Sequence, residues 1–245
     1  DEKTQRGKPP TPATLDRELE LLKRVLNFAV ECRNLSSNPI ANVRLLRKPN
    51  VRMEIVTKDQ FEPLFEACDE KLKPIVLMAF ETGMRLREIL DLRWDQVDLA
   101  QKCVRLRPQD TKAEDYRTVP LTPRLLAMLK SGPQGLPSTA VFRNPATGKP
   151  WQCLRKMWDP AKAKAGRPEL WLHDLRRSFV THARRLGIPE SVVMKLTGHR
   201  TRAVFERYNV IDETDIRAAS DKLGSQDKVE TQLETAPKKT KEATA

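Results

Sequence analysis

The chain has 245 residues, enough for one principal domain with a smaller addition, since domains usually hold about 100 to 200 residues. It is 39% hydrophobic and 32% charged with a mean hydropathy of -0.58, it has no apolar run near the roughly 20 residues of a membrane span, and it shows no secretory signal, so we exclude both classes and expect a cytoplasmic protein. The formal net charge of +12 favours a polyanionic partner, most often nucleic acid.

The front of the chain predicts one amphipathic helix. The polar, Pro-rich opening DEKTQRGKPPTP lacks an initial Met, so we expect the sequence to start inside a longer protein. From Thr14, taken as the N-cap, apolar residues recur at three- and four-residue steps to about Cys32. One such helix cannot bury its own apolar face, so it must pack on preceding helices or on the domain that follows.

A linker and then a new domain follow this helix. Residues 44–52 carry four basic residues around Pro49 and Asn50 without a periodic apolar face, which is typical of a linker. Thr57 and Gln60 then match a capping box, which predicts the start of a helix.

Helical signals continue to about residue 91. Pro74 can open a second apolar helix, Gly83 can end it, and residues 85–91 again have a helical pattern.

The pattern then changes from helical to alternating. Residues 103–107 alternate polar with apolar, and the alternation resumes at residues 119–121, which predicts a β-hairpin with Lys112 near its turn. Residues 141–142 predict a short third strand. Helices return at about residues 151–164, 174–186, 190–196, 201–208 and 212–223. From Gly224 the tail has no large apolar face and a Lys-rich end, so we expect it to be disordered.

Four cysteines are scattered singly, at Cys32, Cys68, Cys103 and Cys153. They form no CxxC pair and no histidine lies near them at ligand spacing, so the sequence indicates no zinc site. We interpret them as small buried hydrophobic residues in a reducing compartment.

The positive charge is concentrated in one part of the chain. Residues 151–208 hold 13 Lys and Arg against 5 Asp and Glu, a net charge of +8 in under a quarter of the sequence. Solvated helix faces are the ordinary explanation of such charge, so the charge favours nucleic-acid binding without proving it.

Three segments carry residues suited to chemistry on a phosphate. TGMRLREIL contains Arg85 and Glu88, WLHDLRRSF contains His173 and Arg176, and LTGHRTRAVFERY contains His199 and Tyr208. Each alone has a structural explanation, because an Arg and a Glu three residues apart often pair on a helix, a lone His often packs, and a Tyr with apolar neighbours often lies in a core. His182 and Tyr116 lack such context, and we interpret both as structural.

Together and in this order, with Lys112 between the first two, the segments resemble the signature of the tyrosine recombinases of the phage-integrase type. The resemblance covers about residues 51–223 and implies a mainly α fold with a small antiparallel β-sheet. It also implies site-specific cleavage and rejoining of DNA through a 3′-phosphotyrosyl intermediate. Residues 1–50 are similar to the end of the family's helical core-binding domain plus a linker, and residues 224–245 form the tail.

The resemblance assigns six catalytic positions: Arg85, Lys112, His173, Arg176, His199 and Tyr208. The chemistry agrees, because a guanidinium donates two parallel hydrogen bonds to phosphate oxygens and keeps its charge. A phenol needs a base to attack, which suits His173 beside Tyr208, and the leaving oxygen needs a proton, which suits Lys112.

Other residues have supporting roles in this interpretation. His199 would hydrogen-bond the phosphate, and Glu88 would fix Arg85 or a histidine without touching DNA. We expect no cofactor, metal or ATP, double-stranded DNA as the partner, and a homotetramer on that DNA. Contacts with backbone phosphates are expected from Arg177, Arg184, Arg200 and Arg202.

Two alternatives remain open. A type IB topoisomerase shares this chemistry but relaxes DNA, and the linker and the short chain favour the integrase type. An inert DNA-binding relative would fit the charge and the fold, although no motif residue is lost. A covalent adduct with a nicked DNA substrate would separate an enzyme from a binding protein.

Overall fold

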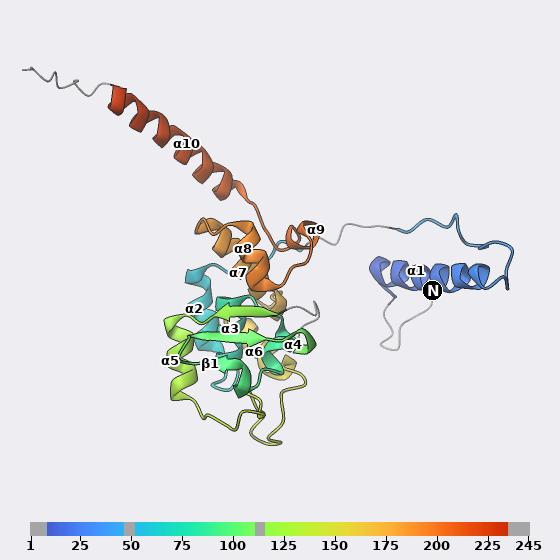
Figure 1. Cartoon of the computed structure of the whole chain (residues 1–245), viewed down its shortest axis with the longest axis horizontal. Helices are drawn as coiled ribbons and strands as arrows, with labels where there is room; N and C mark the ends of the chain where they lie inside the picture. The colour runs from blue at the N-terminus through green and yellow to red at the C-terminus, as the bar shows by residue number, and fades with distance from the viewer. Residues whose placement is uncertain (1–8, 47–51, 111–115, 235–245) are drawn as a thin grey trace, which may run out of the picture. The chain divides into compact units, whose positions relative to one another are not determined.

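The structure, a computed structural model, describes residues 9–46, 52–110 and 116–234. The chain divides into two compact units, Asp1–Arg52 and Met53–Ala245. Figure 1 traces the elements of each unit in chain order. The division falls at the end of the segment that the sequence indicates as a linker.

Among its described residues, the first unit contains one helix, α1 (Pro12–Glu31), as the periodicity predicts. Its N-cap is Thr11, whose side-chain oxygen accepts a hydrogen bond from the backbone N–H of Thr14 at 3.3 Å. The prediction of Thr14 as the cap is therefore wrong by three residues. The reason is Pro12, which suits the first helical position because an N–H there would have no partner.

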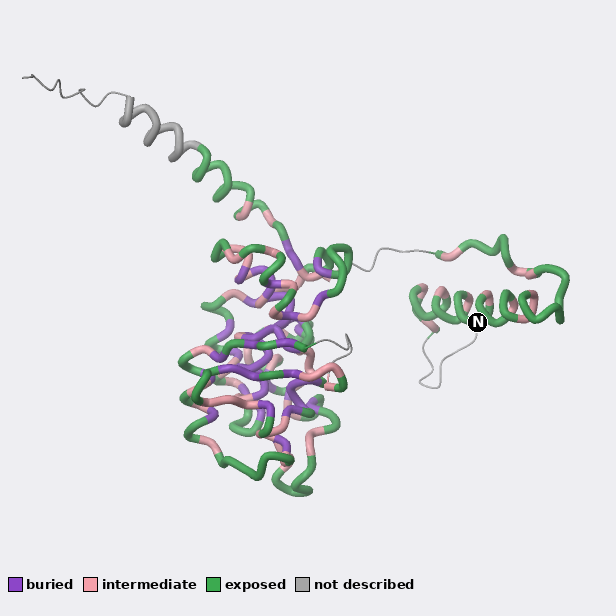
Figure 2. Tube along the Cα trace, viewed as in Figure 1, coloured by how far each residue is buried: buried purple, intermediate pink, exposed green. Residues whose placement is uncertain are grey.

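Polar hydrogen bonds hold the segment after α1 against the helix. Lys23 Nζ donates to the carbonyl oxygens of Ala41 at 2.9 Å and Val43 at 2.5 Å, and the N–H of Leu46 donates to Asp16 Oδ1 at 2.7 Å. No residue of α1 is buried, as the tube in Figure 2 shows. The apolar face of α1 is therefore left open within its own unit.

The second unit begins with two helices whose ends the sequence predicts correctly. α2 (Lys58–Ala67) has the capping box of Thr57 and Gln60, with both reciprocal hydrogen bonds present. α3 (Lys73–Thr82) ends at Gly83, whose φ of 61° is the left-handed conformation that glycine adopts without strain.

α3 is the central helix of this unit. Residues 75–80 are buried around its whole circumference, and the ring of Phe80 stacks on Phe61 of α2 with centroids 3.8 Å apart. α3 also packs against α4 (Leu86–Leu90), α5 (Pro123–Ser131) and α7 (Leu172–Arg185). A helix apolar on all sides has to lie inside a fold, and it gives the neighbouring helices a rigid support.

A three-stranded antiparallel sheet lies beside these helices, in the order β1-β2-β3. The strands are β1 (Val97–Asp98), β2 (Cys103–Leu106) and β3 (Arg117–Pro120), with the 3-10 turns η1 (Trp94–Gln96) and η2 (Pro108–Asp110) before and after the first two. The predicted hairpin is confirmed, and its turn at residues 111–115 lies outside the described residues. The prediction of a third strand at residues 141–142 is wrong. The N–H of Val141 donates to the carbonyl oxygen of Leu92, outside the sheet, and β1 is the third strand instead.

The remaining helices follow the sheet. They are α6 (Arg155–Lys164), α8 (Glu190–Thr197), α9 (Arg202–Phe205) and α10 (Glu213–Glu234), together with α5 and α7. The sequence interpretation omitted α5, although Thr122 and Pro123 mark its start. The disorder expected from Gly224 stays a prediction: α10 continues to Glu234, and residues 235–245 lie outside the described residues.

Two hydrophobic clusters of unequal size hold the second unit together. The large one joins α2, α3, the sheet, α5, α6 and the start of α7. The small one contains four buried residues, Val180, Ala183, Val193 and Phe205, from α7, α8 and α9. α7 runs through both clusters and therefore connects them.

The cysteines divide into two kinds. Cys68 and Cys103 are buried as expected, whereas Cys32 and Cys153 are exposed. The expectation of four buried thiols is wrong for these two, because Cys32 follows the uncovered helix α1 and Cys153 lies in the loop before α6.

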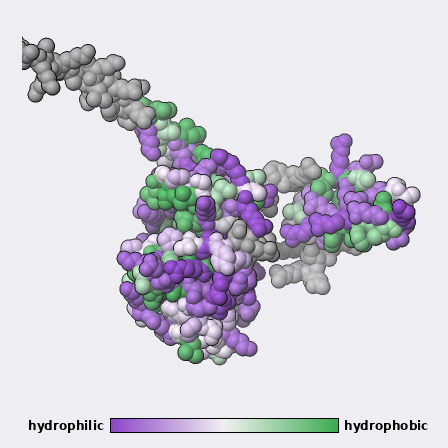
Figure 3. All heavy atoms as spheres, in the orientation of Figure 1, coloured by the Kyte–Doolittle hydropathy of each residue, from purple (hydrophilic) through white to green (hydrophobic). Residues whose placement is uncertain are grey.

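The visible surface carries many charged and polar side chains, as Figure 3 shows. Among the described residues, none of the helices combines the length and apolar character needed to cross a membrane.

Replacing Gly83 with alanine tests the turn that leads into α4. A Cβ at Gly83 would overlap the ring of Phe179, in addition to the strain of a positive φ. Gly148 is the matched control, since it has a φ of 65° and open space around its missing Cβ. We expect Gly83→Ala to lower the free energy of unfolding by about 1–3 kcal/mol more than Gly148→Ala, measured by urea denaturation. Equal losses would mean that Phe179 gives way without cost.

Candidate active site

The turn between α3 and α4 positions the first pair of candidate residues. Arg85 is the N-cap of α4, and its backbone N–H donates to Glu88 Oε2 at 2.9 Å. Its guanidinium also donates to Glu88 Oε1 at 2.8 Å and to the carbonyl of Gly198 at 2.9 Å. The Glu88 side chain is 4% exposed and that of Arg85 25% exposed, so the carboxylate lies beneath the arginine. These contacts hold Glu88 against Arg85, and the expected role of Glu88 in fixing Arg85 stays a prediction.

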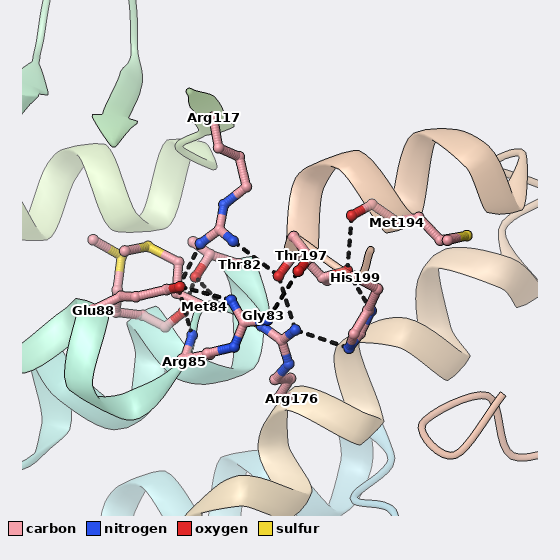
Figure 4. Close-up of polar contacts among 12 residues, drawn as sticks. Thr82, Gly83, Met84, Arg85, Glu88, Arg117, Arg176, Met194, Thr197 and His199 are labelled. Carbon is pink, nitrogen blue, oxygen red and sulfur yellow. Dashed lines mark hydrogen bonds and ion pairs between the residues drawn. The ribbon is translucent and has the colours of Figure 1, made fainter. Parts of the chain in front are cut away.

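A second arginine, Arg117 at the start of β3, reaches the same carboxylate. Arg117 Nη2 donates to Glu88 Oε2 at 2.5 Å, and Nη1 donates to the carbonyl oxygen of Thr197 at 2.9 Å. Figure 4 shows the guanidinium lying between Glu88 on α4 and Thr197 at the end of α8. Burial alone would raise the pKa of Glu88, but the charge of Arg117 and the hydrogen bonds of Arg85 outweigh it and keep the pKa below its usual value.

Arg176 on α7 is the third guanidinium of the group and is 2% exposed. Its Nη1 donates to the carbonyl of Gly83 at 2.6 Å, and its Nη2 donates to the carbonyl of Thr197 at 2.8 Å and lies 2.8 Å from His199 Nε2. Burial and the nearby charge of Arg85 lower the pKa of Arg176, which nevertheless stays charged at neutral pH. Arg176 thus joins the end of α3 to the end of α8 (Figure 4).

The contacts of His199 define its protonation. Thr197 Oγ1 donates to the carbonyl of Val193 at 2.7 Å, so it can only accept from His199 Nδ1, 2.8 Å away. Nδ1 then carries the proton, and Nε2 is left to accept from Arg176. Burial and the charges of Arg176 and Arg85 lower the pKa of His199 to about 3, which matches this neutral form. In this arrangement both ring nitrogens of His199 are engaged, with Arg176 and with Thr197, which argues against the expected hydrogen bond from His199 to the phosphate.

The proposed nucleophile and base lie within hydrogen-bond distance. His173 Nε2, in the first turn of α7, is 2.8 Å from the hydroxyl of Tyr208, just after α9. Desolvation and the charges of Arg176 and Arg177 lower the pKa of His173 below its usual value of 6.5, so it is neutral at pH 7 and able to accept a proton. The Tyr208 ring packs against the small hydrophobic cluster and has the guanidinium of Arg176 5.4 Å from its centre.

This arrangement has an excess of positive charge. Three guanidinium groups, those of Arg85, Arg117 and Arg176, converge on Glu88 and the Thr197 turn, and Glu88 supplies a single negative charge against them. Partly buried positive charge favours a bound anion, and a phosphodiester matches the planar, forked geometry of guanidinium donors. Within the described ranges, no group of three His, Cys, Asp or Glu side chains could hold a metal ion.

Several predicted residues lie elsewhere or have other partners. Lys112 lies outside the described residues. Arg177 is buried and paired with Asp174 at 2.8 Å, and Arg184 pairs with Asp215 at 2.8 Å, which argues against DNA contacts by either.

Two of the expected DNA-binding arginines are accessible to a partner. Arg200 is exposed, and Arg202 is exposed but paired with Glu190 and Glu206. Their contacts with phosphate stay a prediction.

The sequence interpretation did not include Arg117 or Thr197. A signal for Arg117 exists, because it shares the strand face of Val119 and would place a charge toward the core. Thr197 acts mainly through its backbone carbonyl, which no side-chain pattern reveals.

Comparison with known proteins gives one family. The model of the phage integrase family matches residues 54–214. The shufflon-specific DNA recombinase of Escherichia coli is 33% identical over 210 residues, which cover 82% of this chain and 52% of that protein. The integrase of Salmonella phage P22 is 26% identical over 213 residues, covering 82% and 54%. The chain thus spans about half the length of these relatives.

Solved structures share the fold. The Tn1549 transposon integrase in complex with circular intermediate DNA matches with a TM-score of 0.67 and 17% identity, covering 88% of this chain and 80% of that one. A lambda integrase dimer bound to a COC′ core site matches with a TM-score of 0.63 and 15% identity, covering 80% and 59%. Both similarities concern the fold alone.

The buried, neutral His199 predicts a pH dependence of stability. Its pKa is about 3 in the folded chain against 6.5 ordinarily, so between these values the unfolded state holds an extra proton. Stability therefore falls as the pH falls through this window. Between pH about 6.5 and about 4, we expect the wild type to lose about 2–3 kcal/mol more than His199→Gln, measured by urea denaturation at each pH. If the free energy of unfolding of the two proteins fell equally with pH, a neutral His199 would be contradicted.

Proposed function

This chain belongs to the phage integrase family of tyrosine recombinases, and we propose that it cleaves and rejoins DNA strands through a 3′-phosphotyrosyl intermediate at Tyr208. One observation carries the proposal: the 2.8 Å contact between the Tyr208 hydroxyl and His173, next to an arginine group with excess positive charge. A nucleophile, a neutral base and an anion site in one place are what attack on a phosphodiester requires.

The proposed reaction exchanges one ester for another. Tyr208 transfers its proton to His173 Nε2 while its oxygen bonds to phosphorus, and the bond from phosphorus to the 5′ oxygen breaks. The 5′ oxygen leaves as a hydroxyl after taking a proton from Lys112, whose role rests on the sequence. In religation a 5′ hydroxyl attacks the phosphotyrosine and releases Tyr208, so the step needs no ATP.

Arginines would carry the electrostatic part of catalysis. Arg85 is more exposed than Arg176, so it is placed to donate to the non-bridging oxygens of the phosphate as their charge grows. Arg176 has donors committed to carbonyl groups of Gly83 and Thr197, so its charge is fixed before DNA arrives. We propose no metal ion, because guanidinium groups supply the charge that a metal supplies in other nucleases.

The partner and the assembly concern the whole protein, whereas this chain spans about half the length of its curated relatives. We propose double-stranded DNA as the partner, a homotetramer during strand exchange, and action in the bacterial cytoplasm. Residues 51–223 would be the catalytic domain, and residues 1–50 the end of a core-binding domain that adds to DNA affinity.

Removing the hydroxyl of Tyr208 tests the nucleophile. Wild-type protein should become covalently attached to the 3′ side of a nicked DNA substrate, whereas Tyr208→Phe should form no adduct because it has no oxygen to attack phosphorus. The measurement is a denaturing gel that separates free from attached protein.

Tyr116→Phe is the matched control, since Tyr116 is 81% exposed and lies outside the arginine group. It should form adduct like the wild type. An adduct that survives Tyr208→Phe would place the nucleophile elsewhere and overturn the proposal.

The role of Lys112 as the acid is tested by changing the leaving group. We expect Lys112→Ala to slow cleavage of normal DNA by about 10²- to 10⁴-fold, because an alkoxide leaves slowly without a proton. A substrate with sulfur at the bridging 5′ position leaves as a weakly basic thiolate, so Lys112→Ala should recover much of the rate on it. Arg176→Ala should not recover. Equal defects of Lys112→Ala on both substrates would show that Lys112 binds or positions DNA.

A further inference from the structure

Arg117 occupies a position in the sheet where an apolar residue would be expected. It pairs across the hairpin with the buried Leu106, and the next position on the same face of β3 is the buried Val119. An ion pair in such a place stabilises a fold little compared with apolar residues of similar volume. Stability of the sheet therefore does not explain Arg117, and its partners suggest another role.

We propose that Arg117 is a positioning residue for DNA cleavage, which holds the Glu88 carboxylate and the Thr197 turn in place for Arg85 and Arg176. This inference rests on the function proposed above. Arg117 is 7% exposed, so it acts through its partners without contact with DNA.

The first partner of Arg117 controls Arg85. Glu88 receives three hydrogen bonds from Arg85 and Arg117, and Oε2 is shared between the Arg85 backbone and the Arg117 guanidinium. With Arg117 absent, the buried charge of Glu88 would be balanced by Arg85 alone. Arg85 would then be drawn toward the carboxylate and away from a phosphate, because an unbalanced buried charge is costly.

The second partner of Arg117 controls the turn before His199. The carbonyl of Thr197 accepts one hydrogen bond from Arg117 and one from Arg176, and Figure 4 shows the two guanidinium groups reaching it from different elements. Gly198, with a φ of 71°, lies so close that a Cβ there would overlap the Arg117 guanidinium. The turn and Arg117 are therefore fitted to each other.

The test compares variants in single-turnover adduct formation on nicked DNA, with the DNA dissociation constant and thermal unfolding measured in parallel. We expect Arg117→Gln to slow adduct formation by about 10- to 100-fold, a typical effect of displacing a reacting group. Its dissociation constant should rise by much less than the rate falls, because DNA binding is shared among many phosphate contacts whereas cleavage depends on the position of Arg85. Arg117→Lys, which keeps the charge, should recover part of the rate.

Arg105→Gln is the matched control on the neighbouring strand. Arg105 forms an ion pair with Asp98, and the Arg105 side chain is 58% exposed. It should cleave like the wild type. A folded Arg117→Gln that cleaves at the wild-type rate would overturn the proposal, as would a loss of DNA binding equal to the loss of rate.

A double variant tests whether Arg117 acts through Glu88. If it does, Glu88→Gln alone should slow cleavage, and adding Arg117→Gln should slow it little further. If the double variant were slowed by the product of the two single-variant effects, the proposal would be contradicted. If Arg117→Gln alone fails to fold, the double variant and Arg117→Lys carry the test, because neither leaves an unbalanced buried charge. Absence of any adduct from wild-type protein would instead contradict the proposed function itself.

Discussion

Repulsion among three arginines is the constraint that the second unit has to satisfy. Arg85, Arg117 and Arg176 come from a helix cap, a strand and a helix, and they lie together because Glu88 and the Thr197 carbonyl each accept from two of them. Buried α3 supports this group, since its end provides the Gly83 carbonyl to Arg176. Under the proposed function, the fold would thus hold positive charge ready for a phosphate before DNA binds.

Local signals made much of the fold predictable. The capping box at Thr57, the stop at Gly83 and the alternation on both sides of the hairpin depend on neighbours in sequence, and the structure confirms all three. The prediction of the third strand was wrong because that strand depends on a partner strand and not on local sequence signals of its own. β1 has only two residues and is defined by its pairing with β2, so no periodicity of its own marks it.

The candidate site divides in the same way. Arg85 and His173 belong to short motifs that are recognisable in the sequence, and Glu88 follows Arg85 by one helical turn. The link from Arg117 to Thr197 spans 80 residues and ends on a backbone carbonyl, which every residue possesses. Similarly, Arg177 matched a basic pattern, but its pairing with Asp174 becomes visible only when the side chains are placed.

Tyr208 packs against the small hydrophobic cluster of α7, α8 and α9, whereas Arg117 and the Gly83 carbonyl that binds Arg176 belong to β3 and the end of α3, which are part of the large cluster. Regions with few buried contacts open locally at far lower free energy than the whole domain unfolds. We therefore expect a local opening around α9 to move the Tyr208 hydroxyl while α3 and β3 keep their packing. Under the proposed function, the nucleophile would thus belong to a part of the protein that opens more easily than the part that carries Arg85 and Arg117.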